Sequence, residues 1–281
     1  MNLRAERVLD SGDELGECPI WDERTGALWW VDIHGRVVKR YDGENVRLLP
    51  MPEPPGSIAL LRDGGMLVAL QSGLYLLGIE APKRLVRPSG HVTALRFNDG
   101  RCDRAGRFWV GTLEEPDFEP KGVLYRIDPD GTAQAFRTGI QVPNSIAWSP
   151  DGRTMYFADS PRHKIWAFDY DTAHGEFSGE RLFAARHPGF PDGSCVDADG
   201  CLWNAEWGAS RVVRYTPAGK VDRVIDVPAK NPTCCCFGGA QIDTLYITTA
   251  GGEGLFAVEP RARGLAESRF WYIDRQAGGA I

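Results

Sequence analysis

The stretch PNSIAWSPDGRTMYFAD, residues 143–159, contains the unit from which this chain is built. A short apolar segment runs to a turn glycine, Gly152, and a second segment rich in aromatic residues follows it. Aromatic and β-branched residues suit the pleated, half-buried surface of a β-sheet. Similar second segments recur at residues 27–32, 66–70, 107–111, 201–205 and 244–248, and each is followed by a third strand-like segment. We therefore predict six copies of one β-unit.

The spacing of the units indicates how they are arranged. The turn glycines at positions 26, 64, 106, 152 and 200 lie 38 to 48 residues apart, which suits a four-stranded propeller blade. Helical periodicity is nearly absent, and a closed ring removes the sheet edges that an open array would expose. A two-sheet sandwich is the competing architecture, but it does not explain six repeats in register. We predict an all-β, six-bladed β-propeller that forms a single domain over residues 1–281, with residues 6–9 and 269–273 paired in one blade to close the ring.

Composition limits the class of protein. The chain has 281 residues, a net charge of −6 and no basic cluster, which argues against nucleic acids and membranes as partners. The first residues lack the apolar stretch of a signal peptide, and seven cysteines is an odd number. We therefore expect reduced thiols in a cytoplasmic protein, a monomer with a small-molecule partner. The run at 234–236 is expected to be structural, since free cysteine behaves as a small buried hydrophobe.

Polar residues occupy one repeat position. Asn98, Asn144 and Asp192 lie eight residues before a turn glycine, as does Gly56, and Glu17 lies nine before Gly26. Because the first strand of each blade lines a propeller's channel, these side chains should converge at one mouth. Loops between second and third strands should join them there with Asp32, His34, Gln71, Glu114, Glu115, Ser160, Glu206 and Trp207.

This convergence predicts a cation site with open positions. Glu17, Asn144 and Asp192 would supply two carboxylates and an amide oxygen, hard donors that suit Ca²⁺, Mg²⁺ or Mn²⁺. Three protein ligands leave room for water and substrate. The alternative is that each residue only starts a turn, as Asn and Asp often do, and the residues alone leave both interpretations open.

Other catalytic classes find little support in the sequence. The chain has no Gly-x-Ser-x-Gly elbow and no glycine-rich loop that could hold a phosphate before a helix. The five histidines are His34, His91, His163, His174 and His187. His34 and His163 fall in mouth-side loops, but neither has an evident nucleophile partner. A Ser-His-Asp hydrolase is therefore not expected.

Four motifs in order resemble the regucalcin/gluconolactonase (senescence marker protein) family of sugar lactonases. They are LGECPIW at 15–21, RFNDG at 96–100, PNSIAWSPDG at 143–152 and PDGS at 191–194. The resemblance spans residues 13–260, and the CFGG stretch at 236–239 is similar to the family's last blade. It implies a six-bladed propeller with one divalent metal ion in the channel. Calcium is the first expectation for that ion, and Mg²⁺, Mn²⁺, Zn²⁺ and Fe²⁺ stay open.

The resemblance also assigns roles to residues. It implies metal ligands at Glu17, Asn144 and Asp192, with Asp192 also the acid/base. It implies sugar contacts from Arg96, Asn98 and an acid after the Gly-Thr pair at 111–112. Glu115 is our choice for that acid, with Glu114 open. Cys18 departs from the pattern, because glycine is usual beside the metal glutamate, and the change could tune metal preference.

The predicted reaction is hydrolysis of an aldonolactone to the aldonic acid. The metal would polarise the carbonyl and Asp192 would move the proton. The sequence leaves open whether a pentonolactone or a hexonolactone is used. Two alternatives stand beside this hypothesis, a phosphotriester or aryl-ester hydrolase on the same metal propeller and a non-catalytic calcium-binding propeller.

Overall fold

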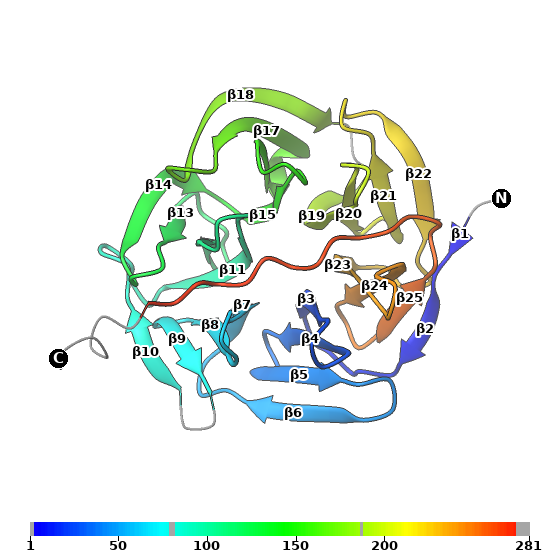
Figure 1. The fold of residues 1–281 in the computed structure, drawn as a ribbon, viewed down its shortest axis with the longest axis horizontal. Coiled ribbons are helices and arrows are strands. Elements are labelled where there is room, and N and C mark those ends of the chain that lie inside the picture. Colours follow the sequence, from blue (N-terminus) through cyan, green and yellow to red (C-terminus); the bar gives the residue numbers. More distant parts are fainter. Residues whose placement is uncertain (1–2, 79–81, 186–187, 274–281) are drawn as a thin grey trace.

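The computed structural model describes residues 3–78, 82–185 and 188–273, and these form six β-sheets around a central axis (Figure 1). In blades 1 to 5 the strand nearest the axis comes first in sequence, and the next three follow by antiparallel pairing. Short hairpin turns connect consecutive strands, so strands that follow each other in sequence lie side by side in the sheet. The fold is the predicted six-bladed propeller.

The blades are numbered here in chain order. Blade 1 contains β3 (Gly16–Asp22), β4 (Ala27–Asp32), β5 (Val37–Tyr41) and β6 (Val46–Pro50). Blade 2 contains β7 (Pro55–Leu60), β8 (Met66–Leu70), β9 (Gly73–Leu77) and β10 (Lys83–Val86). Blade 3 contains β11 (Leu95–Cys102), β12 (Phe108–Glu114), β13 (Gly122–Ile127) and β14 (Ala133–Ile140).

The second half of the ring has the same plan. Blade 4 contains β15 (Pro143–Trp148), β16 (Thr154–Asp159), β17 (Lys164–Asp171) and β18 (Glu176–Ala185), with the short 3₁₀-helix η1 (Ser160–Arg162) before β17. Blade 5 contains β19 (Phe190–Val196), β20 (Leu202–Trp207), β21 (Arg211–Tyr215) and β22 (Val221–Asp226). Blade 6 contains β23 (Pro232–Gly238), β24 (Thr244–Thr249) and β25 (Leu255–Val258).

The N-terminal segment closes the ring as predicted. Strand β2 (Glu6–Leu9) pairs antiparallel with β25 and becomes the outermost strand of blade 6. Strand β1 (Leu3–Arg4) pairs parallel with β22 at the edge of blade 5. One short segment therefore joins the last two blades.

The prediction for residues 269–273 was wrong. The C-terminal segment, residues 259–273, crosses the face of the propeller that is turned towards the viewer in Figure 1 (red), and it runs from blade 5 to blade 3. We call this face the back of the propeller, and the opposite face the mouth. Ala198 N donates to Arg263 O at 2.8 Å, Phe270 N to Leu60 O at 2.8 Å and Trp271 N to Gly106 O at 3.1 Å. The outer place in blade 6 is already filled by β2, so Phe270 buries its ring on the back face, where its exposed fraction is 0%.

The core is divided among the blade interfaces. Six clusters of buried side chains are present in the described chain, one between each pair of adjacent blades. Between blades 3 and 4, Trp109 is fully buried and its Nε1 donates to the Tyr170 hydroxyl at 3.0 Å. Burial of one large apolar side chain contributes about 1.5–3 kcal/mol, so each interface adds to the stability of the ring.

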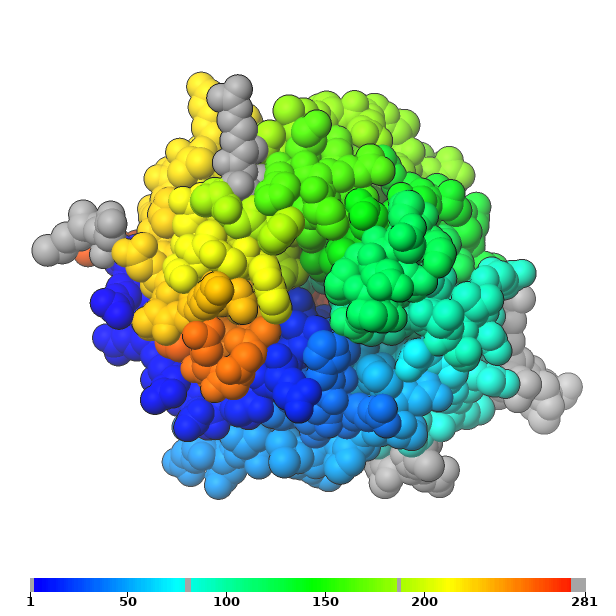
Figure 2. Space-filling view, turned by 180° about the vertical axis from the view of Figure 1, so that it is seen from behind, coloured from blue at the N-terminus to red at the C-terminus, as the bar shows by residue number. Residues whose placement is uncertain are grey.

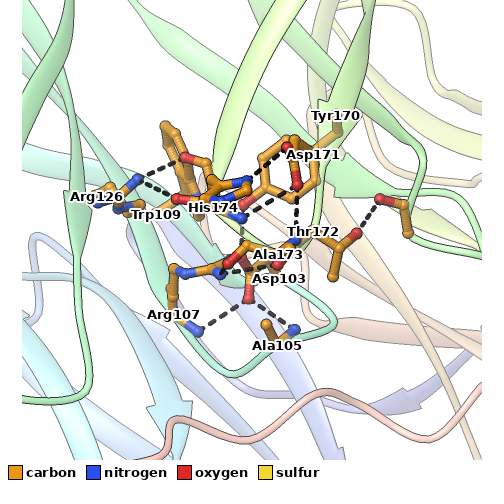
Figure 3. A network of polar contacts seen from close by, with 12 residues as sticks. Asp103, Ala105, Arg107, Trp109, Arg126, Tyr170, Asp171, Thr172, Ala173 and His174 are labelled. Carbon is orange, nitrogen blue, oxygen red and sulfur yellow. Dashed lines mark hydrogen bonds and ion pairs between the residues drawn. The ribbon is translucent and has the colours of Figure 1, made fainter.

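A polar network reinforces this interface (Figure 3). Asp103 Oδ2 accepts from Arg107 Nη1 at 2.6 Å and from the Tyr170 hydroxyl at 2.5 Å. Arg107 Nη2 in turn donates to the carbonyls of Thr172 and Ala173, both at 2.8 Å. Every charged group here has an ionic or carbonyl partner, so the network is structural and joins blade 3 to blade 4.

The seven cysteines are all free and buried. Residues 234–236 lie buried in β23, as expected for cysteines that pack as small apolar side chains. In the described part of the chain, no helix has the length and hydropathy required to cross a bilayer.

Candidate metal and substrate site

One cavity of about 440 Å³ opens at the centre of the face opposite the C-terminal segment (Figure 2). All six residues predicted to bind metal or substrate line it: Glu17, Arg96, Asn98, Glu115, Asn144 and Asp192. They come from blades 1, 3, 4 and 5, so only the closed ring brings them together. Its size is that of a small-molecule site, for which about 300–1,000 Å³ is usual.

A β-bulge at the mouth end of each innermost strand directs these side chains. In blades 1, 4 and 5 the register shifts between Glu17 and Ile20, between Asn144 and Ala147, and between Pro191 and Ser194. A bulge adds a residue to one strand and re-aims its side chains, which is why bulges occur next to active sites. The innermost strands of these blades thus share a bulge at the same repeat position, which the sequence pattern did not reveal.

The bulge explains why glycine would be favoured at the position that Cys18 occupies. This residue has φ 49°, in the left-handed region where a residue with a Cβ is strained. Ser145, which follows Asn144 in blade 4, has φ 58° at the same place. A glycine beside Glu17 would relieve this strain. Cys18 is tolerated with its thiol buried and within 3.5 Å of the Ile58 carbonyl.

The two remaining repeat positions contribute nothing to the cavity for different reasons. A Cβ at Gly56 would lie 2.2 Å from the Phe97 carbonyl oxygen, so no side chain fits there. In blade 6 the equivalent residue is Thr233, whose hydroxyl donates to the Gly16 carbonyl at 2.5 Å. Sequence reasoning missed Thr233 because the sixth turn, near Asp243, lacks the marker glycine.

Glu17 and Asp192 form a buried acidic pair. Burial raises the pKa of Glu17 to about 8, with the charge of Asp99 adding to the effect. Burial and then the charge of Glu17 raise the pKa of Asp192 well above its usual range. Asp192 Oδ1 is buried and has no hydrogen-bond partner among the described residues. Two carboxyl groups that disfavour their own charge are the groups that a cation would stabilise.

These residues fit a divalent ion of the hard class. No cluster of three or more His, Cys, Asp and Glu side chains is arranged for a metal within residues 3–78, 82–185 and 188–273. The expected set has only two such side chains, and its third member is the amide of Asn144. Carboxylate and amide oxygens are what Ca²⁺ and Mg²⁺ prefer, and the unpartnered oxygen of Asp192 is one available donor.

A chain of hydrogen bonds crosses the cavity from blade 3 to blade 5. Arg96 Nη1 donates to Asn98 Oδ1 at 2.7 Å, and Asn98 Nδ2 donates to Asn144 Oδ1 at 3.0 Å. Asn144 Nδ2 donates to Ser160 Oγ at 2.8 Å, and Ser160 Oγ donates to the Pro191 carbonyl at 2.7 Å. Asp192 follows Pro191 directly, so the chain ends beside the acidic pair.

The structure separates the two glutamates that the sequence left open. Glu115 lines the cavity, where its Oε2 accepts from Arg96 Nε at 2.6 Å and its Oε1 lies 3.4 Å from His34 Nε2. Glu114 instead pairs with Lys121 at 2.6 Å, outside the cavity lining. The burial of Glu115 is outweighed by Arg96 and His34, which lower the pKa of its carboxyl group.

The predicted mouth loops divide into two groups. His34, Glu115, Ser160 and Trp207 line the cavity, as expected. The others are occupied elsewhere: Asp32 accepts from the backbone of Glu14 and Leu15, Gln71 donates to the Thr93 carbonyl, Glu206 pairs with Arg211 and Glu114 with Lys121. The ring of His163 contacts that of Phe190 at a tilt of 32°, with the ring centroids 4.5 Å apart, and His187 lies outside the described residues.

Three aromatic side chains line the cavity, and we call them the aromatic wall: Phe118, Phe190 and Trp207. Phe190 and Trp207 are cross-strand partners at the mouth end of blade 5. Phe118 has φ 51° and its carbonyl accepts from Gln141 Nε2 at 3.2 Å, so a strained backbone is held in place. Phe190 was not identified from the sequence, although its place directly before Pro191 and Asp192 was a usable signal.

Comparisons with known proteins agree with this geometry. Residues 15–251 match the sequence model of the SMP-30/Gluconolactonase/LRE-like region. A 6-deoxy-6-sulfogluconolactonase from Pseudomonas putida is 38% identical over 256 residues, which cover 89% of this chain and 88% of that protein. An L-arabinolactonase from Azospirillum brasilense is 38% identical over 291 residues, which cover 95% of each.

A solved structure gives the same picture of the fold. The calcium-binding protein regucalcin from Agrobacterium tumefaciens superposes with a TM-score of 0.91 at 26% sequence identity. The superposition covers 97% of this chain and 99% of that one. The arrangement of blades is therefore shared along the whole chain.

Proposed function

The chain belongs to the SMP-30/gluconolactonase/LRE-like family of sugar lactone hydrolases, and from that premise we propose that it hydrolyses an aldonolactone to the aldonic acid. It would act as a carboxylic ester hydrolase, as the names of its lactonase relatives imply. The observation that carries the proposal is the buried pair of Glu17 and Asp192 in an open cavity, with one carboxylate oxygen of Asp192 unpartnered among the described residues.

We propose that Glu17, Asn144 and Asp192 hold one divalent ion, with Ca²⁺ the first candidate. The donor set supports this assignment because it contains only oxygen atoms, and a calcium-binding protein shares the fold. When bound, the ion would supply Lewis-acid chemistry, polarising the lactone carbonyl towards attack by water. Mg²⁺, Mn²⁺, Zn²⁺ and Fe²⁺ are the ions to compare with it.

Asp192 is the proposed acid/base. Its carboxylate would take a proton from the water that adds to the lactone carbonyl carbon. The bond between that carbon and the ring oxygen then breaks, and Asp192 returns the proton to the departing ring oxygen. The products are one carboxylic acid and one hydroxyl group, so the atoms balance with water as the only co-reactant.

Arg96, Asn98 and Glu115 are proposed to orient the sugar. Glu115 is held by Arg96, and its side chain keeps an exposed fraction of 30%, so its carboxylate can accept further hydrogen bonds from substrate hydroxyls. A group held by a charged partner is positioned before substrate arrives, which lowers the entropic cost of orienting it. Trp207 and the loop at 114–121 are proposed to discriminate pentonolactones from hexonolactones.

A lactone panel tests the proposal. The protein would be stripped of metal, each divalent ion restored in turn, and acid release measured for pentonolactones, hexonolactones, a phosphotriester and an aryl ester. We expect lactone hydrolysis that requires the ion, and its loss in Glu17→Gln. Glu180→Gln is the matched control, because this glutamate pairs with Arg137 at 2.8 Å and lies outside the cavity lining. Metal binding without turnover of any lactone would favour the non-catalytic calcium-binding alternative, and faster phosphotriester turnover the esterase alternative.

A further inference from the structure

The hydrogen-bond chain from Arg96 to Pro191 has a fixed direction. Its first member, the guanidinium of Arg96, can only donate, and its last, the Pro191 carbonyl, can only accept. The amides of Asn98 and Asn144 each have one donating and one accepting end. With both ends of the chain fixed, only one orientation of each amide lets every link form.

Ser160 sets the far end of this chain. It is the first residue of η1 and is buried, with 6% of its surface exposed. Its single hydroxyl hydrogen is given to the Pro191 carbonyl at 2.7 Å, so towards Asn144 the oxygen can only accept. The group facing it at 2.8 Å is therefore the Asn144 NH₂, and the amide oxygen points the other way.

At the near end the same orientation is required. Asn98 Nδ2 donates both to the Pro143 carbonyl at 2.9 Å and to Asn144 Oδ1 at 3.0 Å. A flipped Asn144 amide would place two NH₂ groups against each other there. It would also force Ser160 to choose between the Asn144 oxygen and the Pro191 carbonyl. A buried polar group left unpartnered in this way is costly.

We propose that Ser160 is a positioning residue for the cation site, through two contacts of its hydroxyl. It fixes the Asn144 amide with the oxygen directed to the cavity, and it ties blade 4 to the residue directly before Asp192 in blade 5. One side chain thus sets both the orientation of one metal donor and its spacing from another. This inference rests on the proposed cation site. Partners of metal ligands change affinity by about 10- to 100-fold when they are removed.

The test is calcium affinity of the stripped protein, measured by isothermal titration calorimetry. Ser160→Ala is expected to weaken binding about 10- to 100-fold. Ser57→Ala is the matched control, since Ser57 is fully buried on an innermost strand and its hydroxyl has no hydrogen-bond partner within the described residues. Its affinity should stay within about twofold of the parent. Ser160→Thr keeps the hydroxyl and should recover most of the loss.

A double-mutant cycle isolates the orientation effect. In Asn144→Asp both ends of the side chain are oxygen, so orientation no longer matters. Ser160→Ala added to that background should weaken calcium binding by less than about threefold. A loss as large as in the parent background would show that Ser160 acts only through the blade 4 to blade 5 link.

The other outcomes distinguish a failure of this inference from a failure of the proposed cation site. A lower melting temperature of the metal-free Ser160→Ala protein with unchanged calcium affinity would overturn the inference and leave Ser160 a purely structural residue. If Ser160→Ala does not fold, Ser160→Cys, which keeps the volume with a weaker donor, takes its place under the same criterion. If the parent binds no divalent ion, or Glu17→Gln binds as tightly as the parent, then the cation site itself is wrong.

Discussion

At the mouth of the channel two acidic side chains, Glu17 and Asp192, are buried against each other, whereas at the back a half-buried acid, Glu267, pairs with the guanidinium of Arg101. The back pair has opposite charges and the mouth pair has like ones. Opposite charges stabilise each other when both leave water, but like charges raise each other's cost. The ion pair at the back therefore stabilises the fold. The acidic pair at the mouth lacks a positively charged partner, which a bound cation would supply.

The largest effect is expected at the mouth, from Asp192→Asn. This change keeps the shape of the side chain but removes the proposed acid/base and one anionic metal donor. General acid–base catalysis contributes about 10²- to 10⁴-fold, so kcat/KM for the preferred lactone should fall at least about 10³-fold when metal binding is weakened as well. A pH-indicator assay with calcium in excess measures this. Unchanged turnover in a folded variant would remove Asp192 from the mechanism.

The back end should respond in stability instead. Glu267→Gln removes the carboxylate that forms an ion pair with the buried Arg101, which costs about 3–5 kcal/mol of unfolding free energy. The double change Arg101→Met with Glu267→Leu removes both charges and should recover most of that loss. Urea denaturation of the parent, the single variant and the double variant measures the unfolding free energy of each. A loss below about 1 kcal/mol in Glu267→Gln would mean that the pair is not what holds the C-terminal segment in place.

Asp99 lies on β11 between Asn98 at the mouth and Arg101 at the back, and it gives a prediction for the pH dependence of stability. Burial raises the pKa of Asp99 to about 6, although Arg101 and the Ile146 backbone N–H, at 2.8 Å, act against the rise. Because the folded pKa lies above the unfolded one, its contribution to stability is present below about pH 4 and is lost as pH rises through about 6. The loss amounts to about 3 kcal/mol. Denaturation of the metal-free protein from pH 4 to 7 should show a flatter profile for Asp99→Asn. Parallel profiles would contradict this prediction.

The smallest effect is expected from the aromatic wall. Trp207→Ala should raise KM for the preferred lactone about three- to tenfold, since a partly exposed ring loses about 1 kcal/mol of apolar contact with a ligand. Trp271→Ala, on the C-terminal segment at the back, is the matched control and should leave KM unchanged. Equal changes in both variants would indicate a general loss of packing rather than a substrate contact.

Much of the site could be predicted from sequence because a closed repeat turns position along the chain into position in space. Glu17, Asn98, Asn144 and Asp192 occupy one repeat position, and all four line the cavity. Glu115 could not be separated from Glu114 in this way. Adjacent strand residues point to opposite faces, and the strand's end at Glu114 was not visible in the pattern.

What the sequence by itself determined is the ring, since six strand patterns at regular spacing leave little alternative to a propeller. The bulges, the left-handed Cys18, the path of residues 259–273 and the direction of the hydrogen bonds through Ser160 were decided by the tertiary structure. The physical reason is the distance along the chain over which each property is set. Strand patterning is a local property of the chain, whereas a donor's partner or a segment's resting place depends on residues from other blades.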